Sequence, residues 1–397
     1  MSVTTRPRID EDIQSALGTC QQALAPIHGE MTGKLGLEAD RWFDLLQAVP
    51  ASRTAMVRLR RLGRKLPPGH IGHYALLQAF MVSLPMVAAL PAEEWIKHQI
   101  CTLARQVAFP PKGWERHFAL DGEPFKEMAK IATLRRLPAG QLTFDIENLP
   151  RSWLMKIHPL DLPTVLREVL TGMGGFGPVA VPHLCHWRPN PLVMLRAESE
   201  RSLWRIAKSL ETLPKVKGLA AASWFYASEV GQAFPHLSWL RDFFVEQGAT
   251  VVDMEPAPLD SGFLVGSAKR RQLHEAGHFH PRRALVLWRR EDMLDWAAAH
   301  PELGESPEPA ILLRPVPPVA PPRRVVAQRR IASGRHTLLN GIKLLNHNPK
   351  LYILLILLLP ALAVTLAASV GLGGWAAAPT FCLTAALLWV AQYFLLQ

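Results

Sequence analysis

The sequence predicts an α/β or α+β domain with a helical N-terminal part, followed by a C-terminal transmembrane helical hairpin. Three observations predict this. Apolar residues recur at helical spacing up to about residue 135, strand-like and helical segments alternate from about residue 140, and residues 351–397 carry no Asp, Glu, Lys or Arg. With 397 residues, 49% of them apolar, the chain is long enough for more than one domain and is not a disordered tail.

These patterns divide the chain into five segments. They are a mainly helical region (1–135), an α/β domain (136–300), a Pro-rich linker (301–322), a basic juxtamembrane segment (323–350) and two transmembrane helices (351–397). The linker holds eight prolines, a density that favours extended polyproline geometry. We therefore expect it to hold the α/β domain away from a surface.

Two features justify the helical region. Apolar side chains recur one helical turn apart around Trp42 to Val49 and again around Trp95 to Val107. Residues 74–90 are uncharged and follow a cluster of arginines, but the stretch is shorter than the ~20 residues that span a bilayer. We interpret 74–90 as a buried core helix, and leave a spanning or interfacial role open as the alternative.

A change in the spacing of apolar residues near residue 140 predicts the α/β domain. The strand-like and helical segments occur in a sequence that favours a partly parallel sheet. Strands are expected at 142–146, 250–254 and 284–288, and helices at 202–210, 236–247, 267–277 and 291–299.

The charge distribution indicates the partner. Seven Lys and Arg but no acid lie in residues 323–350, which accounts for seven of the eleven excess positive charges. This segment resembles an amphipathic helix lying on anionic headgroups of the lipid bilayer. The positive-inside rule then places the bulk of the chain in the cytoplasm, at the inner membrane. No motif favours nucleic acid.

The most specific motif is His274-Glu275-Ala276-Gly277-His278, which matches HExxH. In metalloproteases this spacing places two histidines on zinc, with the glutamate polarising a water molecule. The five-residue sequence resembles the zinc motif of the membrane-bound AAA metalloproteases, although the chain lacks their GxxxxGK[ST] phosphate loop. Gly277 is typical of a helix end, which would move His278 away from His274. A membrane-tethered zinc metallopeptidase using His274 and His278 is therefore one alternative.

The same residues carry a second resemblance. A helix over 267–276, preceded by a helix and the strand 250–254, resembles the C-terminal half of GNAT-type acyltransferases, in which a helix ending in an LYExxGF-like phrase follows a parallel strand. Leu273 to Phe279 is the corresponding phrase here. The resemblance implies that His274 takes the place of the general-acid tyrosine of that family. The acyl-CoA pyrophosphate loop of the family is absent near residue 230, where Ser228 to Gly231 stands.

Other polar groups fit several roles. Arginine pairs surround the motif and could bind an anionic ligand or headgroup, or form surface salt bridges. These are Arg270, Arg271, Arg282 and Arg283. Asp145 and Glu147 share one face of a strand and are either an acid/base pair or an exposed strand surface. His183 and His186 flank Cys185 in what we interpret as a structural loop.

The sequence therefore predicts a membrane-anchored cytoplasmic protein. If the protein is an enzyme, we expect a group-transfer activity of the acyltransferase type on a small or lipid-like substrate. His274 and Glu275 are the catalytic candidates. The alternatives are the zinc metallopeptidase and a non-catalytic membrane adaptor. The sequence identifies no cofactor.

Overall fold

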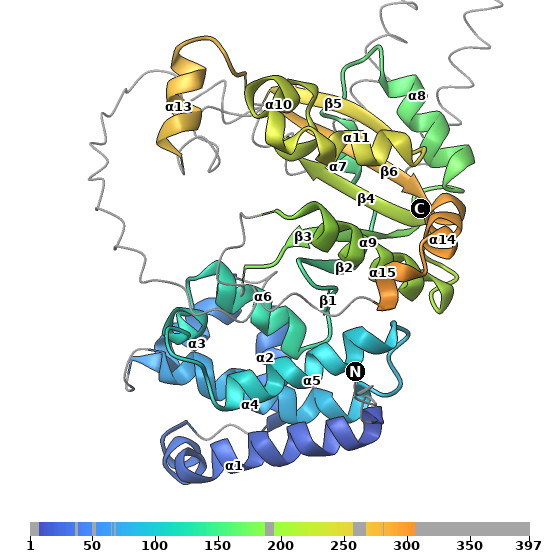
Figure 1. Ribbon diagram of the computed structural model, residues 1–397. Coiled ribbons are helices and arrows are strands. Elements are labelled where there is room, and N and C mark those ends of the chain that lie inside the picture. The colour runs from blue at the N-terminus through green and yellow to red at the C-terminus, as the bar shows by residue number, and fades with distance from the viewer. Residues whose placement is uncertain are drawn as a thin grey trace, which may run out of the picture. The chain divides into compact units, whose positions relative to one another are not determined.

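The computed structural model describes residues 8–35, 39–49, 53–64, 66, 69–186, 194–256, 267–280 and 282–305 (Figure 1). All of these belong to one compact unit, Met1–Ala320. The basic juxtamembrane segment, the two predicted transmembrane helices and the linker beyond residue 305 lie outside the described residues, so they stay predictions. Among the helices that are described, none combines the length and the hydrophobicity needed to span a bilayer.

The N-terminal part is a helical assembly built around one buried helix. α4 is apolar on nearly all sides and packs against the helices on both sides of it in sequence, so residues 74–83 form a buried core helix. The predicted core helix over 74–90 is too long, because α4 ends at Ser83 and Met86 is exposed. The helices are α1 (Ile9–Leu35), α2 (Ala39–Ala48), α3 (Arg53–Gly63), α4 (His70–Ser83), η1 (Leu84–Met86), α5 (Glu94–Ala108), η2 (Glu115–Phe118) and α6 (Glu123–Ala132).

α5 illustrates how the sequence produces these helices. The side chain of Glu93 accepts a hydrogen bond from the backbone N–H of Trp95 at 2.8 Å and so caps the first turn. Ile96, Ile100 and Leu103 then fall on one face and are fully buried. α5 and α6 also pack against the first strand of the sheet, so the helices and the sheet share one hydrophobic core (Figure 1).

A six-stranded mixed sheet forms the second part, with strand order β1-β2-β3-β4-β6-β5. Only β3 and β4 are parallel, and the other neighbouring strands are antiparallel. The strands are β1 (Arg136–Pro138), β2 (Leu142–Asn148), β3 (Pro178–Leu184), β4 (Gly218–Ser223), β5 (Thr250–Pro256) and β6 (Arg282–Arg289).

Helices cover both faces of the sheet, and alternate strand residues point to each face. On β6, Val286 and Trp288 pack into the larger core with α9, α11 and α14, whereas Leu285 and Leu287 pack into a smaller core with α7 and α8. The remaining helices are α7 (Arg151–Leu154), α8 (Leu162–Arg167), η3 (Glu168–Gly172), α9 (Arg196–Glu211), η4 (Trp224–Tyr226), α10 (Ser228–Ala233), η5 (Pro235–Leu237), α11 (Trp239–Glu246), α13 (Ala268–Glu275), α14 (Arg290–Ala299) and α15 (Glu302–Glu305).

The structure confirms a mixed α/β domain with N-terminal helices and corrects three expectations. β5, the strand that the acyltransferase resemblance took as parallel, pairs antiparallel with β6. The helices that follow the second strand of the parallel pair are α10 and α11, not α13. The start of the predicted linker is also not extended, because Glu302–Glu305 form α15, which packs on α9.

Candidate functional site

β3 and β4 separate soon after they meet. Their only register pair is Ala180 with Leu219, although both strands continue beyond it. At the two ends of β3, the carbonyl of Gly177 accepts a hydrogen bond from Leu149, and the N–H of Cys185 donates one to Gln141, both on the β2 side. Backbone groups alternate in direction along a strand. The odd-numbered residues of β3 therefore direct their backbone groups to β2, and the even-numbered residues direct theirs to β4. Pro182 is even-numbered and has no N–H. It therefore cannot donate the next hydrogen bond to β4.

A cavity of about 540 Å³ occupies this separation. The ends of β3 and β4 line it, together with one face of α6 and residues that follow each strand. Its apolar wall comprises Leu142, Leu184, Met194 and Phe225, and its ionisable residues are Glu123, Lys126, Glu127, Lys130, Arg136, His183, His186 and Tyr226. Its volume falls in the range of small-molecule sites, and its lining is more polar than apolar.

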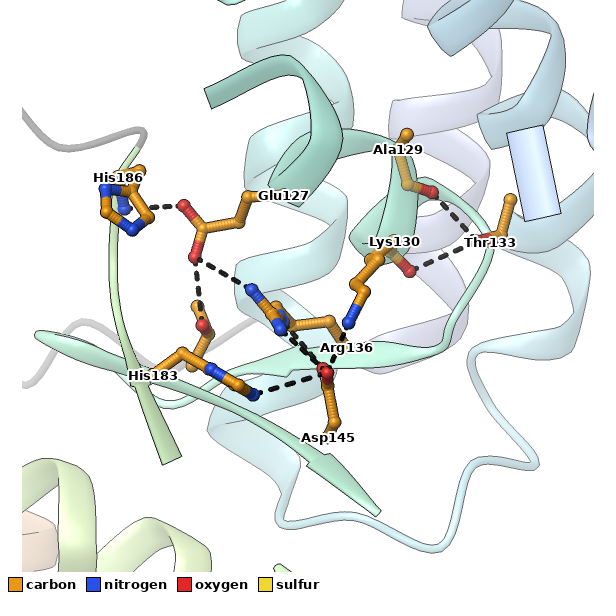
Figure 2. A network of polar contacts seen from close by, with 9 residues as sticks. Glu127, Ala129, Lys130, Thr133, Arg136, Asp145, His183 and His186 are labelled. Atoms are coloured by element: carbon orange, nitrogen blue, oxygen red, sulfur yellow. Dashed lines mark hydrogen bonds and ion pairs between the residues drawn. The ribbon is translucent and has the colours of Figure 1, made fainter. Parts of the chain in front are cut away.

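The first polar element of the cavity is a histidine held by a buried carboxylate (Figure 2). The β2–β3 register places Asp145 and His183 diagonally across from each other on the same face, and His183 Nε2 lies 3.3 Å from Asp145 Oδ2. Arg136 holds the carboxylate with a bidentate pair of hydrogen bonds, from Nε at 2.6 Å and Nη2 at 2.7 Å. Lys130 Nζ lies 2.5 Å from the same Oδ2.

The charges around Asp145 decide its ionisation. Burial by itself would raise the pKa of this carboxyl, but the bidentate hydrogen bonds and the charge of Arg136, with His183 alongside, hold the pKa well below its usual range. Asp145 is therefore a carboxylate at neutral pH. The His183 side chain is about one-third exposed. Its ring therefore lies against Asp145 and also lines the cavity.

The second polar element joins α6 to the end of β3. Glu127 is almost fully buried and accepts a hydrogen bond from the backbone N–H of His186 at 2.5 Å and from the hydroxyl of Thr143 at 2.9 Å (Figure 2). Burial lowers the pKa of the His186 ring, which favours its neutral form at neutral pH. Two histidines on one strand end, each fixed through a carboxylate, therefore line the cavity.

Tyr226 lines the cavity beyond the end of β4. It is fixed by edge-to-face packing on Phe244, with ring centroids 5.3 Å apart. Burial raises the pKa of Tyr226 to about 12, so the phenol keeps its proton at neutral pH. The cavity thus has imidazole groups on the β3 side and a protonated hydroxyl on the β4 side.

The catalytic candidates from the sequence do not line this cavity. His274 and Glu275 end α13, and His274 Nδ1 lies 3.0 Å from the carbonyl oxygen of Phe279. Gly277 has φ +73°, the left-handed conformation typical of a helix end, so His278 follows the helix rather than continuing it. Among the residues with described coordinates, no three His, Cys, Asp or Glu side chains are grouped to hold a metal ion. The roles of His274, Glu275 and His278 stay predictions.

The four arginines that the sequence singled out do not form one cluster around a ligand site. Arg270 stacks over the ring of Trp224, with its guanidinium carbon 5.1 Å from the ring centroid, and Arg282 Nε lies 3.2 Å from a carboxylate oxygen of Glu229. Arg271 and Arg283 form no ion pair within the part of the chain that the structure describes. Their proposed role in anion binding likewise stays a prediction.

The groups that the structure brings together were visible in the sequence separately. Asp145 was paired there with Glu147, but Glu147 is exposed and Asp145 is buried. The sequence places His183 and His186 in a loop, because no second cluster at zinc-site spacing accompanies them, whereas the structure places His183 in β3. The alternation of Val179, Val181 and His183 on one face was the signal that could have identified this strand.

Comparison with known proteins gives limited similarity. No protein-family model and no curated protein matches the chain. Among solved structures, an acyltransferase mutant in complex with octanoyl-CoA is 14% identical, with a TM-score of 0.38 over 72% of this chain and 90% of that chain. An acyltransferase in complex with decanoyl-CoA and teicoplanin is 13% identical, with the same TM-score and the same coverage. Similarity of this degree assigns neither a residue nor a ligand to this chain.

Proposed function

We propose that this chain is an acyltransferase that binds an acyl thioester of coenzyme A in the cavity between β3 and β4 and transfers the acyl group to an amine or hydroxyl acceptor. The single observation that carries the proposal is the opening of the sheet at its one parallel pair, with His183 and Tyr226 on its two sides. This deepens the group-transfer prediction from the sequence but moves the site from α13 to the strand ends.

The opening suits an extended donor that contains amides. Beyond Ala180, the even-numbered residues of β3 direct their backbone groups to an edge that β4 no longer occupies. Unpaired strand edges bind extended chains by adding them as a further strand. The pantetheine arm of coenzyme A is such a chain, and the apolar wall formed by Leu184, Met194 and Phe225 offers a surface for an acyl group. α9 begins two residues after Met194, so its N-terminal amides lie close enough along the chain to receive phosphate.

The histidine supplies the base for such a reaction. His183 would accept a proton from the acceptor N–H or O–H, whose nitrogen or oxygen then attacks the thioester carbonyl carbon. Collapse of the tetrahedral intermediate breaks the C–S bond. The departing thiolate takes the proton of Tyr226, and the proton on His183 returns to the tyrosinate through solvent. The net result is an acylated acceptor and free coenzyme A thiol.

A binding and transfer experiment tests the proposal. Full-length protein in detergent micelles is titrated with coenzyme A and octanoyl-CoA by calorimetry, and thiol release from octanoyl-CoA is followed with a panel of small amines and alcohols. We expect Ala222→Phe, which fills the opening, to weaken octanoyl-CoA binding at least tenfold. Ala298→Phe on the exposed face of α14 is the matched control and leaves binding unchanged. The proposal is wrong if wild-type protein binds neither thioester nor coenzyme A at millimolar concentration, or if Ala222→Phe binds as tightly as wild type.

We also propose that the uncharged residues 351–397 anchor this enzyme in the inner membrane, with residues 1–320 in the cytoplasm. The support is the sequence alone, through the uncharged stretch and the seven cations that precede it. A reporter active only in the cytoplasm, fused after Gln397, should be active. Recovery of the full-length protein in the soluble fraction after cell lysis would contradict the anchor.

A further inference from the structure

The two histidines of the cavity depend on carboxylates from different elements. Asp145 of β2 lies against the ring of His183, and Glu127 of α6 holds the backbone N–H of His186. The two carboxylates belong to different elements, so a group that contacts both of them would connect the two histidines.

Arg136 is that connecting group (Figure 2). Its Nε and Nη2 bind the two oxygens of Asp145, and its Nη1 lies 3.9 Å from Glu127 Oε1. The β1–β2 register places it directly across from Asp145, and its side chain is only 9% exposed. A guanidinium can direct nitrogens to two carboxylates at fixed angles, whereas an ammonium is a single point charge.

We propose that Arg136 is a positioning residue that fixes both cavity histidines at once, through Asp145 for His183 and through Glu127 for His186. The inference rests on the proposed function only where it takes His183 as the base, since the arrangement of the rings can be measured without any reaction. It adds a role for a residue of the helix-to-sheet junction that touches no reacting atom.

Because other charged groups surround the two histidines, the effect of Arg136 on ring orientation can be measured separately from the effect of its charge. The ionisable groups that line the cavity beside the two rings are Glu123, Lys126, Glu127 and Lys130 from α6, Arg136 from β1 and Tyr226, and Asp145 of β2 lies against His183. Lys130 lies 2.5 Å from Asp145, so we expect the carboxylate to keep a cation when Arg136 is altered. Arg136→Lys retains the charge at this position and removes the forked geometry. It therefore tests positioning directly.

The test uses ¹⁵N-histidine NMR titration of the full-length protein, with ring signals assigned from His183→Gln and His186→Gln. We expect Arg136→Lys to change the tautomer-sensitive nitrogen shifts of both rings, and Arg136→Met to raise the titration midpoint of His186 by at least 0.5 pH unit because a nearby cation is lost. Asp145→Asn should alter mainly His183 and Glu127→Gln mainly His186. Arg135→Met, in an adjacent exposed arginine bonded to the carbonyl of Gln47, is the control and should alter neither.

Two outcomes would overturn the proposal. One is that Arg136→Lys leaves the ring nitrogen shifts of both histidines as in wild type, which would mean that Arg136 contributes only its charge. The other is that Arg136 variants alter one ring and not the other. In the transfer assay, Arg136→Lys should lower kcat about tenfold with KM for octanoyl-CoA within twofold. Absence of transfer by wild-type protein would refute the proposed function while leaving the ring measurements to decide the role of Arg136.

Discussion

Two buried aspartates in this protein each hold a histidine and an arginine, in different surroundings. In the helical part, Asp12 Oδ2 lies 2.8 Å from Nδ1 of His98, and its Oδ1 lies 2.5 Å from Arg105. In the sheet, Asp145 combines His183 with Arg136. Lys130 adds a second cation beside Asp145. The two histidines differ in their exposure and in whether they line a cavity.

His98 connects helices. Its Nδ1 binds Asp12 of α1, its Nε2 lies 3.9 Å from Glu94 of α5, and its side chain is half as exposed as that of His183. His183 instead lines the cavity that the separation of β3 and β4 creates. A carboxylate–histidine–arginine group therefore lies between packed helices in one case and beside an open volume in the other.

The largest expected effect separates these two roles by activity. His183→Ala should lower kcat for acyl transfer by about 10²–10⁴-fold, the range that positioned general bases contribute, while the unfolding temperature stays close to wild type. His98→Ala should leave kcat unchanged within about twofold. The measurements are thiol release from octanoyl-CoA and thermal unfolding by circular dichroism. Equal loss of activity in both variants would remove the distinction.

The next-largest expected effect is on stability and not on activity. Asp12→Ala removes the acceptor of two charged donors between α1 and α5 and should lower the free energy of unfolding by about 1–3 kcal/mol, because hydrogen bonds to charged groups are lost and Arg105 keeps its charge in a partly buried place. Urea unfolding measures it, with Asp10→Ala on the exposed side of the same helix turn as control. Asp12→Ala protein that still folds should transfer acyl groups at the wild-type rate.

A smaller effect tests whether the opening itself distinguishes the two groups. Pro182→Val restores a backbone N–H on the β4 side of β3, where one further hydrogen bond of about 0.5–1.5 kcal/mol can form. The strands should then pair further and the cavity narrow. We expect octanoyl-CoA affinity to fall by about three- to tenfold, measured by calorimetry. Pro178→Val, at the first residue of β3, is the matched control. Unchanged affinity in Pro182→Val would mean that another feature keeps the strands apart.

The smallest expected effect concerns acid stability. The pKa of Asp145 is lowered in the folded protein, so its stabilising contribution is complete above its unfolded pKa of about 3.9 and is lost as the pH falls toward the folded value. The free energy of unfolding of wild-type protein should therefore decrease from pH 5 to pH 3, and Asp145→Asn should show a smaller decrease. Urea titrations at each pH measure this. Parallel pH profiles for the two proteins would show that Asp145 is not preferentially ionised in the folded state.

Much of the secondary structure could be predicted from the sequence, because local periodicity encodes it. The strand over 142–146, the helix over 291–299 and the strand over 284–288 are present as β2, α14 and β6 with boundaries shifted by a few residues. β3 was missed because its glycine-rich approach and its prolines resemble a loop. The physical reason is tertiary, since a strand that loses its partner on one side can accept Pro182 there.

The candidate site could not be predicted in the same way. The rare spacing of His274 and His278 drew the sequence analysis to α13, but spacing along a chain is informative only if the helix continues, and it ends at Glu275. Asp145 and His183 are 38 positions apart, and no local pattern states which strand lies beside β2. Antiparallel pairing of β2 with β3 brings them together.

By itself, the sequence determined the helical and strand segments, the mixed α/β class, and the concentration of positive charge before an uncharged end, because these are local properties of composition and period. Only the tertiary structure decided that β3 and β4 are the one parallel pair, that they separate after Ala180, and that Asp145, His183 and Arg136 meet beside the opening. Strand order and register depend on which faces bury each other across the whole core. Distant segments compete for these pairings, so strand order and register cannot be predicted from any single segment.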